Sequence, residues 1–268
     1  MEKFLITGGS GFLGTALVER LQEHNLVILS RNEGNLVKLK EKYPNIEIIV
    51  GDIRDKQTCR KALNGVTGVF HLAAMKHVGL AEENPRECVM SNLLGTINLL
   101  DEFRGDFFLF ISTDKAEKVS SVYGATKFIS EKLLKEYEKI NKTKYRIVRY
   151  GNVLYSTGSV LCKWKDKIAK GEEITVTDLD STRFYWTVGS AINLIFECLE
   201  KATDCTPYCP EMKSITMKDL VGCMLEKYGE VPIKLTGLQP GENKHELCGG
   251  KWSNEVSQYT KEEIMEMI

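Results

Sequence analysis

Short apolar runs alternate with segments of helical character through the first 150 residues. Runs of this kind are typical of parallel strands buried on both faces, with the intervening segments forming crossover helices. The connections are expected to be right-handed. The pattern therefore predicts an α/β fold with a Rossmann-type, doubly wound parallel sheet over residues 1–150. The six runs are KFLIT (3–7), NLVILS (25–30), IEIIV (46–50), GVFHLA (68–73), FFLFIS (107–112) and YRIVRY (145–150).

The regular alternation loosens after residue 150. Helices are predicted at about 160–170, 188–201 and 217–228, and the run EITVT at 173–177 predicts a short strand. We interpret residues 151–268 as a smaller C-terminal substrate-binding lobe. Because no linker or low-complexity tract separates the two parts, we expect them to pack closely.

Composition narrows the class of partner. Of the 268 residues 43% are hydrophobic and 27% charged, and the formal net charge is -1, which gives no electrostatic reason to expect nucleic acid or membrane. The chain opens directly on an apolar strand and contains no run of about 18 apolar residues, so we expect no export signal, no membrane span and a cytoplasmic location. Eight cysteines without a CxxC pair and four histidines without ligand spacing predict no metal site. A small molecule is the expected partner.

A glycine-rich segment follows the first strand and runs into a helical pattern. A turn at this place needs residues that tolerate positive φ, and a diphosphate approaches backbone N–H groups only where no side chain intervenes. The alternative is a glycine-rich turn without a ligand. The context favours a dinucleotide cradle, with cofactor contacts from Gly8, Ser10, Gly11, Phe12, Leu13 and Gly14.

The end of the second strand bears on the choice of dinucleotide. An NAD-binding protein usually places a carboxylate here, whereas this chain has Ser30 and Arg31. A hydroxyl and a guanidinium suit a 2′-phosphate, which favours NADP. The alternative is that Arg31 is a solvated surface charge. Asp52 and Ile53, after the third strand, are expected beside the adenine, with helix capping as the alternative for Asp52.

Tyr123 and Lys127 are separated by four residues in a helical segment and so share a helix face. An ammonium beside a phenol favours phenolate, so we expect Lys127 to draw the pKa of Tyr123 down from about 10 toward neutrality. Tyr123 could then accept a proton from an alcohol whose carbon gives a hydride to a nicotinamide. Ser112 or Thr113, at the preceding strand end, would hold the same hydroxyl.

Asp114 and Lys115 have no use in simple alcohol oxidation. An acid and a base beside an oxidised carbon suit elimination, because a C4 ketone acidifies the C5 proton and an acid helps the C6 hydroxyl to leave as water. The alternative is that Asp114 caps a turn and Lys115 is solvated.

With these motifs together, the sequence resembles the extended short-chain dehydrogenase/reductase superfamily and, within it, the polysaccharide-biosynthesis group of UDP-N-acetylglucosamine 4,6-dehydratases that invert C5. The resemblance covers nearly the whole chain. It is carried by ITGGSGFLG, LSRNE, HLAAMKHVGLAEENP, SNLLGTINLL, STDKA, YGATK, RYGNVLYSTGSV, ITVTDLDSTRF and GLQPGENKHEL.

The resemblance implies a catalytic set of Thr113, Asp114, Lys115, Tyr123 and Lys127. Tyr123 with Lys127 would start oxidation at C4, Lys115 would abstract the C5 proton, and Asp114 would protonate the departing C6 hydroxyl before the hydride returns to C6. Thr113 would hold the substrate.

Further positions carry implied contacts. Ala73 would line the cofactor, and Asn92 would be structural, as His71 could also be. The implied substrate contacts are Lys76, His77, Asn152, Ser159, Val160, Arg183 and Glu242, with Arg183 favoured for the diphosphate. A homo-oligomer is also implied.

Two positions depart from the family pattern, which usually carries arginine where this chain has Thr157 and Gln239. This leaves open a rearranged diphosphate grip using Lys163 or Lys165, or a different nucleotide. Two other functions also stay open: a nucleotide-sugar C4 epimerase or 4-ketoreductase, which would not need Asp114 and Lys115, and a non-catalytic NADP-sensing protein.

Overall fold

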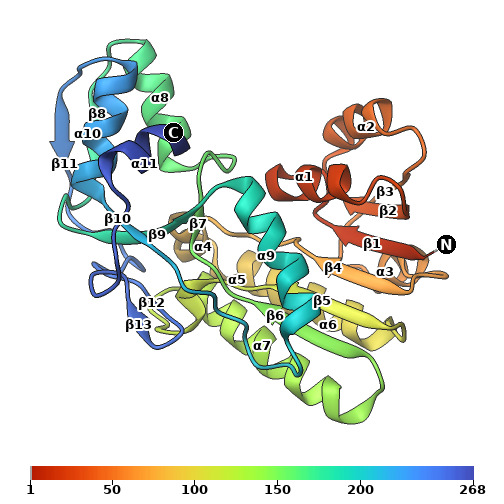
Figure 1. Ribbon diagram of the computed structural model, residues 1–268. Coiled ribbons are helices and arrows are strands. Elements are labelled where there is room, and N and C mark those ends of the chain that lie inside the picture. The colour runs from red at the N-terminus through yellow and green to blue at the C-terminus, as the bar shows by residue number, and fades with distance from the viewer. Residues whose placement is uncertain (1) are drawn as a thin grey trace.

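The structure, a computed structural model, describes residues 2–268 and is built around a parallel six-stranded sheet (Figure 1). The strand order is β3-β2-β1-β4-β5-β6, so the chain reverses its direction of progress across the sheet between β1 and β4. This confirms the predicted doubly wound Rossmann sheet. The strands are β1 (Lys3–Thr7), β2 (Asn25–Ser30), β3 (Glu47–Val50), β4 (Gly68–His71), β5 (Phe107–Ile111) and β6 (Lys144–Val148).

Helices cover both faces of this sheet because successive strand residues point to opposite sides. Phe4 and Ile6 of β1 belong to one buried cluster, and Leu5 belongs to the other. The first face packs against α1 (Phe12–Arg20), α2 (Glu33–Lys42) and α9 (Val188–Lys201). The second packs against α3 (Lys56–Ala62), α6 (Gly95–Glu102) and α7 (Val122–Ile140).

Helix α9 comes from beyond residue 150 yet lies on the Rossmann sheet, where it contacts α1 and β6 (Figure 1). Its Ile192 and Ile195 share a buried cluster with Phe4 and Ile6. The segment predicted as a helix at 188–201 is therefore a helix, and it belongs to the first hydrophobic core. Residue 150 is not a boundary between separate cores.

Most of the remaining C-terminal elements form a smaller lobe with its own buried cluster, which includes Trp164, Ile174, Leu220 and Met224. Its helices include those expected at about 160–170 and 217–228, and β8 lies in the predicted EITVT run. The elements are α8 (Val160–Ala169), α10 (Met217–Tyr228), α11 (Lys261–Met267), β7 (Asn152–Val153), β8 (Ile174–Val176), β9 (Thr182–Trp186), β10 (Ser214–Thr216), β11 (Ile233–Leu235), β12 (Leu247–Cys248) and β13 (Lys251–Trp252). Val153 of β7 and Cys248 of β12 instead pack with the first cluster of the sheet.

Short elements connect the sheet to its second helical layer. Between β4 and α6 the chain forms α4 (Val78–Glu83), α5 (Pro85–Val89) and a π-helical turn (Met90–Leu94), and a 3-10 turn (Asp114–Ala116) separates β5 from α7. Across residues 2–268, no helix has the combination of length and apolar character required to cross a membrane.

Candidate active site

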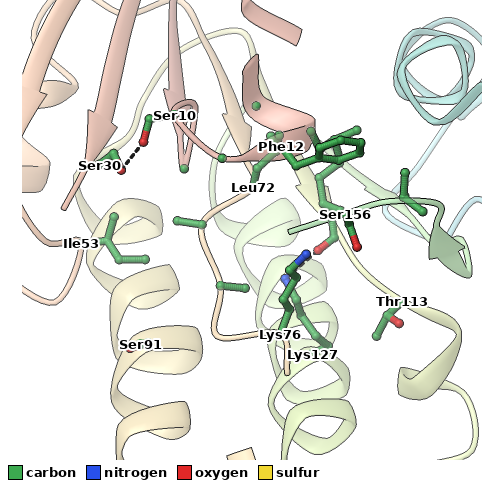
Figure 2. A pocket seen from close by; sticks show the side chains of 18 of the residues that line it. Ser10, Phe12, Ser30, Ile53, Leu72, Lys76, Ser91, Thr113, Lys127 and Ser156 are labelled. Atoms are coloured by element: carbon green, nitrogen blue, oxygen red, sulfur yellow. Dashed lines mark hydrogen bonds between the residues drawn. The ribbon is translucent and has the colours of Figure 1, made fainter. Parts of the chain in front are cut away.

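A cavity of about 440 Å³ opens at the carboxyl ends of the parallel strands (Figure 2). This is where ligands bind in open α/β sheets, beside the point at which the strand order reverses. Its wall brings together most of the residues singled out from the sequence: Gly8, Ser10, Gly11, Phe12, Leu13, Gly14, Ser30, Arg31, Asp52, Ile53, Ala73, Lys76, Thr113, Lys115, Tyr123, Lys127 and Asn152.

The glycine turn has the geometry that its sequence predicts. Gly8 has a φ of +70°, and a Cβ there would lie 2.9 Å from the Ala73 nitrogen. A Cβ on Gly14 would lie 2.4 Å from the Gly8 carbonyl oxygen, so α1 could not approach the strand end this closely with a side chain. Helix α1 starts after Gly11 without a side-chain cap. Its first N–H groups are therefore suited to an anion such as a diphosphate.

The far end of the cavity is polar and lacks a carboxylate at the end of β2. Ser10 Oγ donates to Ser30 Oγ at 2.7 Å (Figure 2). Arg31 is 63% exposed, with Nη1 3.8 Å from Asp52 Oδ2. Asn32 and Asn35 also line this end, although we did not single them out from the sequence. Their position directly after the second predicted strand was the available signal.

Asp52 is held by Arg54 rather than left free. Arg54 Nε donates to Asp52 Oδ2 at 2.8 Å, and its backbone N–H donates to Oδ1 at 2.9 Å. Although partial burial acts to raise it, the pKa of Asp52 lies below its ordinary value because of these bonds and the Arg54 charge. The capping alternative for Asp52 is wrong, since Asp55 accepts the N–H groups of Gln57 and Thr58 at the start of α3.

Tyr123 and Lys127 reach the cavity from the first turns of α7. Ser121 caps this helix by accepting the Gly124 N–H, and a Cβ on Gly124 would lie 2.3 Å from the Lys115 carbonyl oxygen. Glycine at this position thus allows the helix to rest directly on the 3-10 turn. Figure 2 shows Lys127 from α7 and Lys76 from the loop after β4 extending into the same space.

Burial controls the protonation of this pair. Burial lowers the pKa of Lys127 to about 7 and raises the pKa of Tyr123 to about 12. Lys127 Nζ donates to the Ile111 carbonyl at 2.7 Å. The prediction that Lys127 draws the pKa of Tyr123 toward neutrality is therefore wrong for this structure, because desolvation disfavours the phenolate.

Asp114 and Lys115 form a buried ion pair. Asp114 is 1% exposed, and its Oδ1 accepts from Lys115 Nζ at 3.0 Å and from Thr113 Oγ1 at 2.8 Å. Its Oδ2 is buried without a hydrogen-bond partner among residues 2–268. Lys115 Nζ also lies 3.4 Å from Glu246 Oε1. The solvated alternative for Lys115 is wrong, and Asp114 lies behind the cavity wall, which it reaches through Thr113 and Lys115.

The protonation preferences within this cluster differ. Burial raises the pKa of Asp114 despite the opposing charge of Lys115. Burial alone would lower the pKa of Lys115, but Asp114 and Glu246 outweigh it and raise that pKa above its ordinary value. Glu246 was missed from the sequence; its place in the GLQPGENKHEL stretch was the only signal.

Several predicted substrate contacts lie away from the cavity wall. Arg183 is buried, and its Nη1 donates to the carbonyls of Thr182 and Lys244, both at 2.9 Å. The prediction of Arg183 as a diphosphate contact has no support in this geometry because the guanidinium is already used within the lobe. Four other predicted substrate contacts also lie outside the wall. The His77 ring lies against Gly158. Ser159 and Val160 lie at the start of α8, and Glu242 accepts the Gln239 N–H.

Two buried polar residues are structural. The two ring nitrogens of His71 lie 2.6 Å from the Thr7 hydroxyl and 2.9 Å from the Thr96 hydroxyl. This agrees with the alternative that His71 is a structural residue. Asn92 Nδ2 donates to the Met75 carbonyl and to Thr126 Oγ1, both at 3.0 Å. Asn92 thereby ties the loop after β4 to α7.

A doubly wound Rossmann sheet, a glycine turn entering α1, and Thr113, Tyr123 and Lys127 around one cavity define an extended short-chain dehydrogenase/reductase. Within that class, residues 4–267 match the family model described as polysaccharide biosynthesis protein. The chain belongs to this family.

Named relatives support this assignment. A Methanocaldococcus jannaschii protein named uncharacterized membrane protein MJ1061 is 37% identical over 261 residues, which is 90% of this chain and 78% of that protein. The Campylobacter jejuni UDP-N-acetylglucosamine 4,6-dehydratase (inverting) is 32% identical over 259 residues, or 92% and 77% of the two chains. Matches at 30% identity and below include proteins named UDP-glucose 4-epimerase.

The X-ray structure of Pen from Bacillus thuringiensis has the same fold. It is 34% identical, with a TM-score of 0.88, and the match covers 91% of this chain and 80% of that one.

Proposed function

We propose that this protein is a nucleotide-sugar 4,6-dehydratase that uses NADP and acts on UDP-N-acetylglucosamine. The observation that carries the proposal is the buried Asp114–Lys115 pair beside Tyr123, since an epimerase or a ketoreductase has no use for this acid and amine. The C. jejuni relative named for this reaction supports it. The nicotinamide cofactor would be held by the glycine turn and would supply the acceptor and donor of the hydride.

We assign three of the reaction's four proton transfers to residues; the fourth returns a proton to C5. Tyr123 would accept the C4 hydroxyl proton in its phenolate form, which burial disfavours in the cofactor-free protein by raising its pKa to about 12. Lys127, whose pKa is about 7, would have to be protonated in the bound complex to help offset that cost. Lys115 removes the C5 proton once its own proton has passed to Asp114 across their 3.0 Å contact. That transfer leaves a neutral amine as base and a carboxylic acid as proton donor.

The acid reaches the substrate through Thr113. Thr113 Oγ1 lies 2.8 Å from Asp114 Oδ1 and lines the cavity, whereas Asp114 does not. When Asp114 is protonated it can donate to Thr113, whose hydroxyl proton then passes to the departing C6 oxygen. The leaving group is water. The hydride taken from C4 is returned to C6, and C5 then takes up a solvent-exchanged proton, which restores its C–H bond.

The reaction is tested with purified protein, UDP-N-acetylglucosamine and heavy water, without added cofactor. We expect a product lighter by one water that carries deuterium at C5, detected by mass spectrometry and NMR. Asp114→Asn and Lys115→Ala should abolish the loss of water while cofactor binding persists, whereas the exposed Asp180→Asn and Lys234→Ala should retain it. A product of unchanged mass with inverted C4 would identify an epimerase, and no conversion with intact cofactor binding would favour a sensor.

The preference for NADP is supported by Ser30 and Arg31 at the end of β2 and by the engagement of Asp52 with Arg54. We expect the wild-type protein to bind NADP at least about tenfold more tightly than NAD, as one charge-assisted contact permits. Arg31→Ala should remove most of that preference in a fluorescence titration without changing NAD affinity. Equal affinities in the wild-type protein would contradict the assignment.

Assembly and location also belong to this proposal. A homo-oligomer is favoured by exposed apolar side chains on neighbouring helices, among them Leu80 of α4, Val89 of α5 and Phe128 and Ile129 of α7. Analytical ultracentrifugation tests it. A cytoplasmic location is tested by fractionation of cells that express the protein from its own gene.

A further inference from the structure

The proposed reaction leaves one buried carboxylate without a role. Glu246 is 2% exposed and lies just before β12, in the C-terminal lobe, more than 100 positions after the Asp114–Lys115 pair. Its Oε1 lies 3.4 Å from Lys115 Nζ and 3.9 Å from Arg183 Nε. Removing a carboxylate from water is unfavourable unless the charge is paired, so a residue in this position needs these partners.

The backbone around Glu246 fixes the direction of its side chain. The Glu246 N–H donates to Ser253 Oγ at 2.9 Å, and the Ser253 N–H donates to the Glu246 carbonyl at 2.8 Å. Asn243 Nδ2 donates to Glu246 Oε2 at 3.3 Å. Strand β12 also packs against the 3-10 turn that carries Lys115. Ser253 therefore fixes the backbone of Glu246 and Asn243 fixes its carboxylate, and together these contacts place the carboxylate against the Lys115 amine.

Charged and titratable groups face Lys115 from every packed element. Asp114 comes from its own turn, Glu246 from the segment before β12, and Arg183 and Tyr185 from β9, while Tyr123 comes from α7. Lys115 therefore lies between two carboxylates, with one guanidinium beyond them.

We propose that Glu246 is a positioning residue for the elimination: it holds the Lys115 amine opposite Asp114 and sets the pH range in which this pair serves as base and acid. This rests on the proposed function. The charge of Glu246 stabilises the Lys115 ammonium and, as a like charge, favours the protonated form of Asp114. Removing that charge should make both groups lose their protons at lower pH.

The first test is the pH dependence of kcat. The pH profile of kcat has two limbs, one set by deprotonation of Lys115 and one by deprotonation of Asp114. In Glu246→Gln both limbs should move to lower pH by about 1–3 units, as expected for loss of a charge at this distance. Glu246→Asp keeps the charge and should keep the pH position while lowering kcat through altered geometry. Glu211→Gln, an exposed partner of Lys251, is the matched control and should leave the profile unchanged. A Glu246→Gln profile that superimposes on the wild type after scaling would overturn the proposal.

A second measurement does not depend on the reaction. In protein labelled with ¹⁵N-lysine and saturated with NADP, the Lys115 Nζ signal, assigned by its loss in Lys115→Ala, should titrate at lower pH in Glu246→Gln than in the wild type. If Glu246→Gln does not fold, Asn243→Ala, which removes the support of Glu246 Oε2, should shift the titration in the same direction. If the wild type catalyses the elimination but the Lys115 titration is the same in Glu246→Gln, the proposed role of Glu246 is wrong and the proposed function is unaffected. If the Lys115 titration shifts but the wild type catalyses no elimination, the proposed function is wrong, although Glu246 and Lys115 are electrostatically coupled.

Discussion

Lys127 points into the cavity with its amine on the Ile111 carbonyl and 4.2 Å from the Phe110 ring centroid. Both contacts favour an ammonium, but burial outweighs them and lowers the pKa of Lys127 from 10.5 to about 7. A spacing of four residues correctly predicts that Tyr123 and Lys127 share a helix face. It carries no information about desolvation, which depends on residues distant in sequence, and this is why the pKa of Tyr123 could not be predicted.

Lys127 should leave a signature in the pH dependence of stability. The unfolded ammonium keeps its proton up to about pH 10.5, while the folded group loses it near 7, so the unfolded state binds more protons between these values. The burial penalty is complete below pH 7 and disappears as pH rises toward 10.5. Relative to Lys127→Met, the wild-type free energy of unfolding should increase by about 1 kcal/mol per pH unit from pH 7 to 9.

Urea denaturation of the cofactor-free protein at each pH measures this difference. Lys139→Met, at the exposed end of the same helix, controls for the loss of a lysine elsewhere on α7. If the unfolding free energy of the wild type minus that of Lys127→Met stays constant or falls as pH increases, the buried Lys127 amine is not the titrating group.

At the scale of elements, the approach of α1 to the end of β1 depends on close contacts between backbones. The strands and most helices could be predicted because their periodicity is local, and the glycine turn because positive φ and close approach restrict residue choice. The packing of α9 on the sheet, the Asp52–Arg54 pair and the position of Glu246 could not. Each depends on which distant segments meet, and a single sequence does not report this.

Gly14→Ala tests the turn. The new Cβ would lie 2.4 Å from the Gly8 oxygen and 2.5 Å from the Gly9 Cα, both backbone atoms that cannot move aside without opening the turn. We expect a loss of about 1–3 kcal/mol in unfolding free energy together with at least tenfold weaker NADP binding. Gly222→Ala, in the exposed middle of α10 with no atom near its Cβ, should instead stabilise by about 0.5–1 kcal/mol. Chemical denaturation and cofactor titration of both variants measure these effects. A Gly14→Ala variant with unchanged stability and NADP affinity would show that these backbone contacts do not restrict the residue at this position.

On the scale of the whole molecule, a chain of charges joins the sheet, α7 and the C-terminal hairpin. Arg149, just after β6, donates to Glu131 of α7 and, at 2.9 Å, to Glu117 Oε2. Glu117 also accepts the N–H groups of Gly249 and Gly250, at 2.7 and 2.8 Å. The loop between β12 and β13 is thus anchored to the segment that follows the Asp114–Lys115 turn.

Glu117→Gln should loosen that anchor. Loss of the charge weakens the bonds to Arg149 and to both glycine N–H groups, and we expect a cost of about 1–3 kcal/mol in unfolding free energy. Hydrogen exchange at Gly249 and Gly250 should accelerate more than exchange in the six-stranded sheet. Glu211→Gln is again the control. If Gly249 and Gly250 exchange at the same rate in the wild type and in Glu117→Gln, the hairpin is held by other contacts.

The position of α9 has a consequence for how such a protein can be built and altered. A fragment ending near residue 150 would contain all six sheet strands together with α1 and α2, but the part of that face that Ile192 and Ile195 of α9 normally cover would be exposed to water. Such a fragment should aggregate when expressed alone. The two parts of the chain are consequently not interchangeable: a chimaera that exchanges the C-terminal lobe must keep α9 from the parent whose sheet it covers.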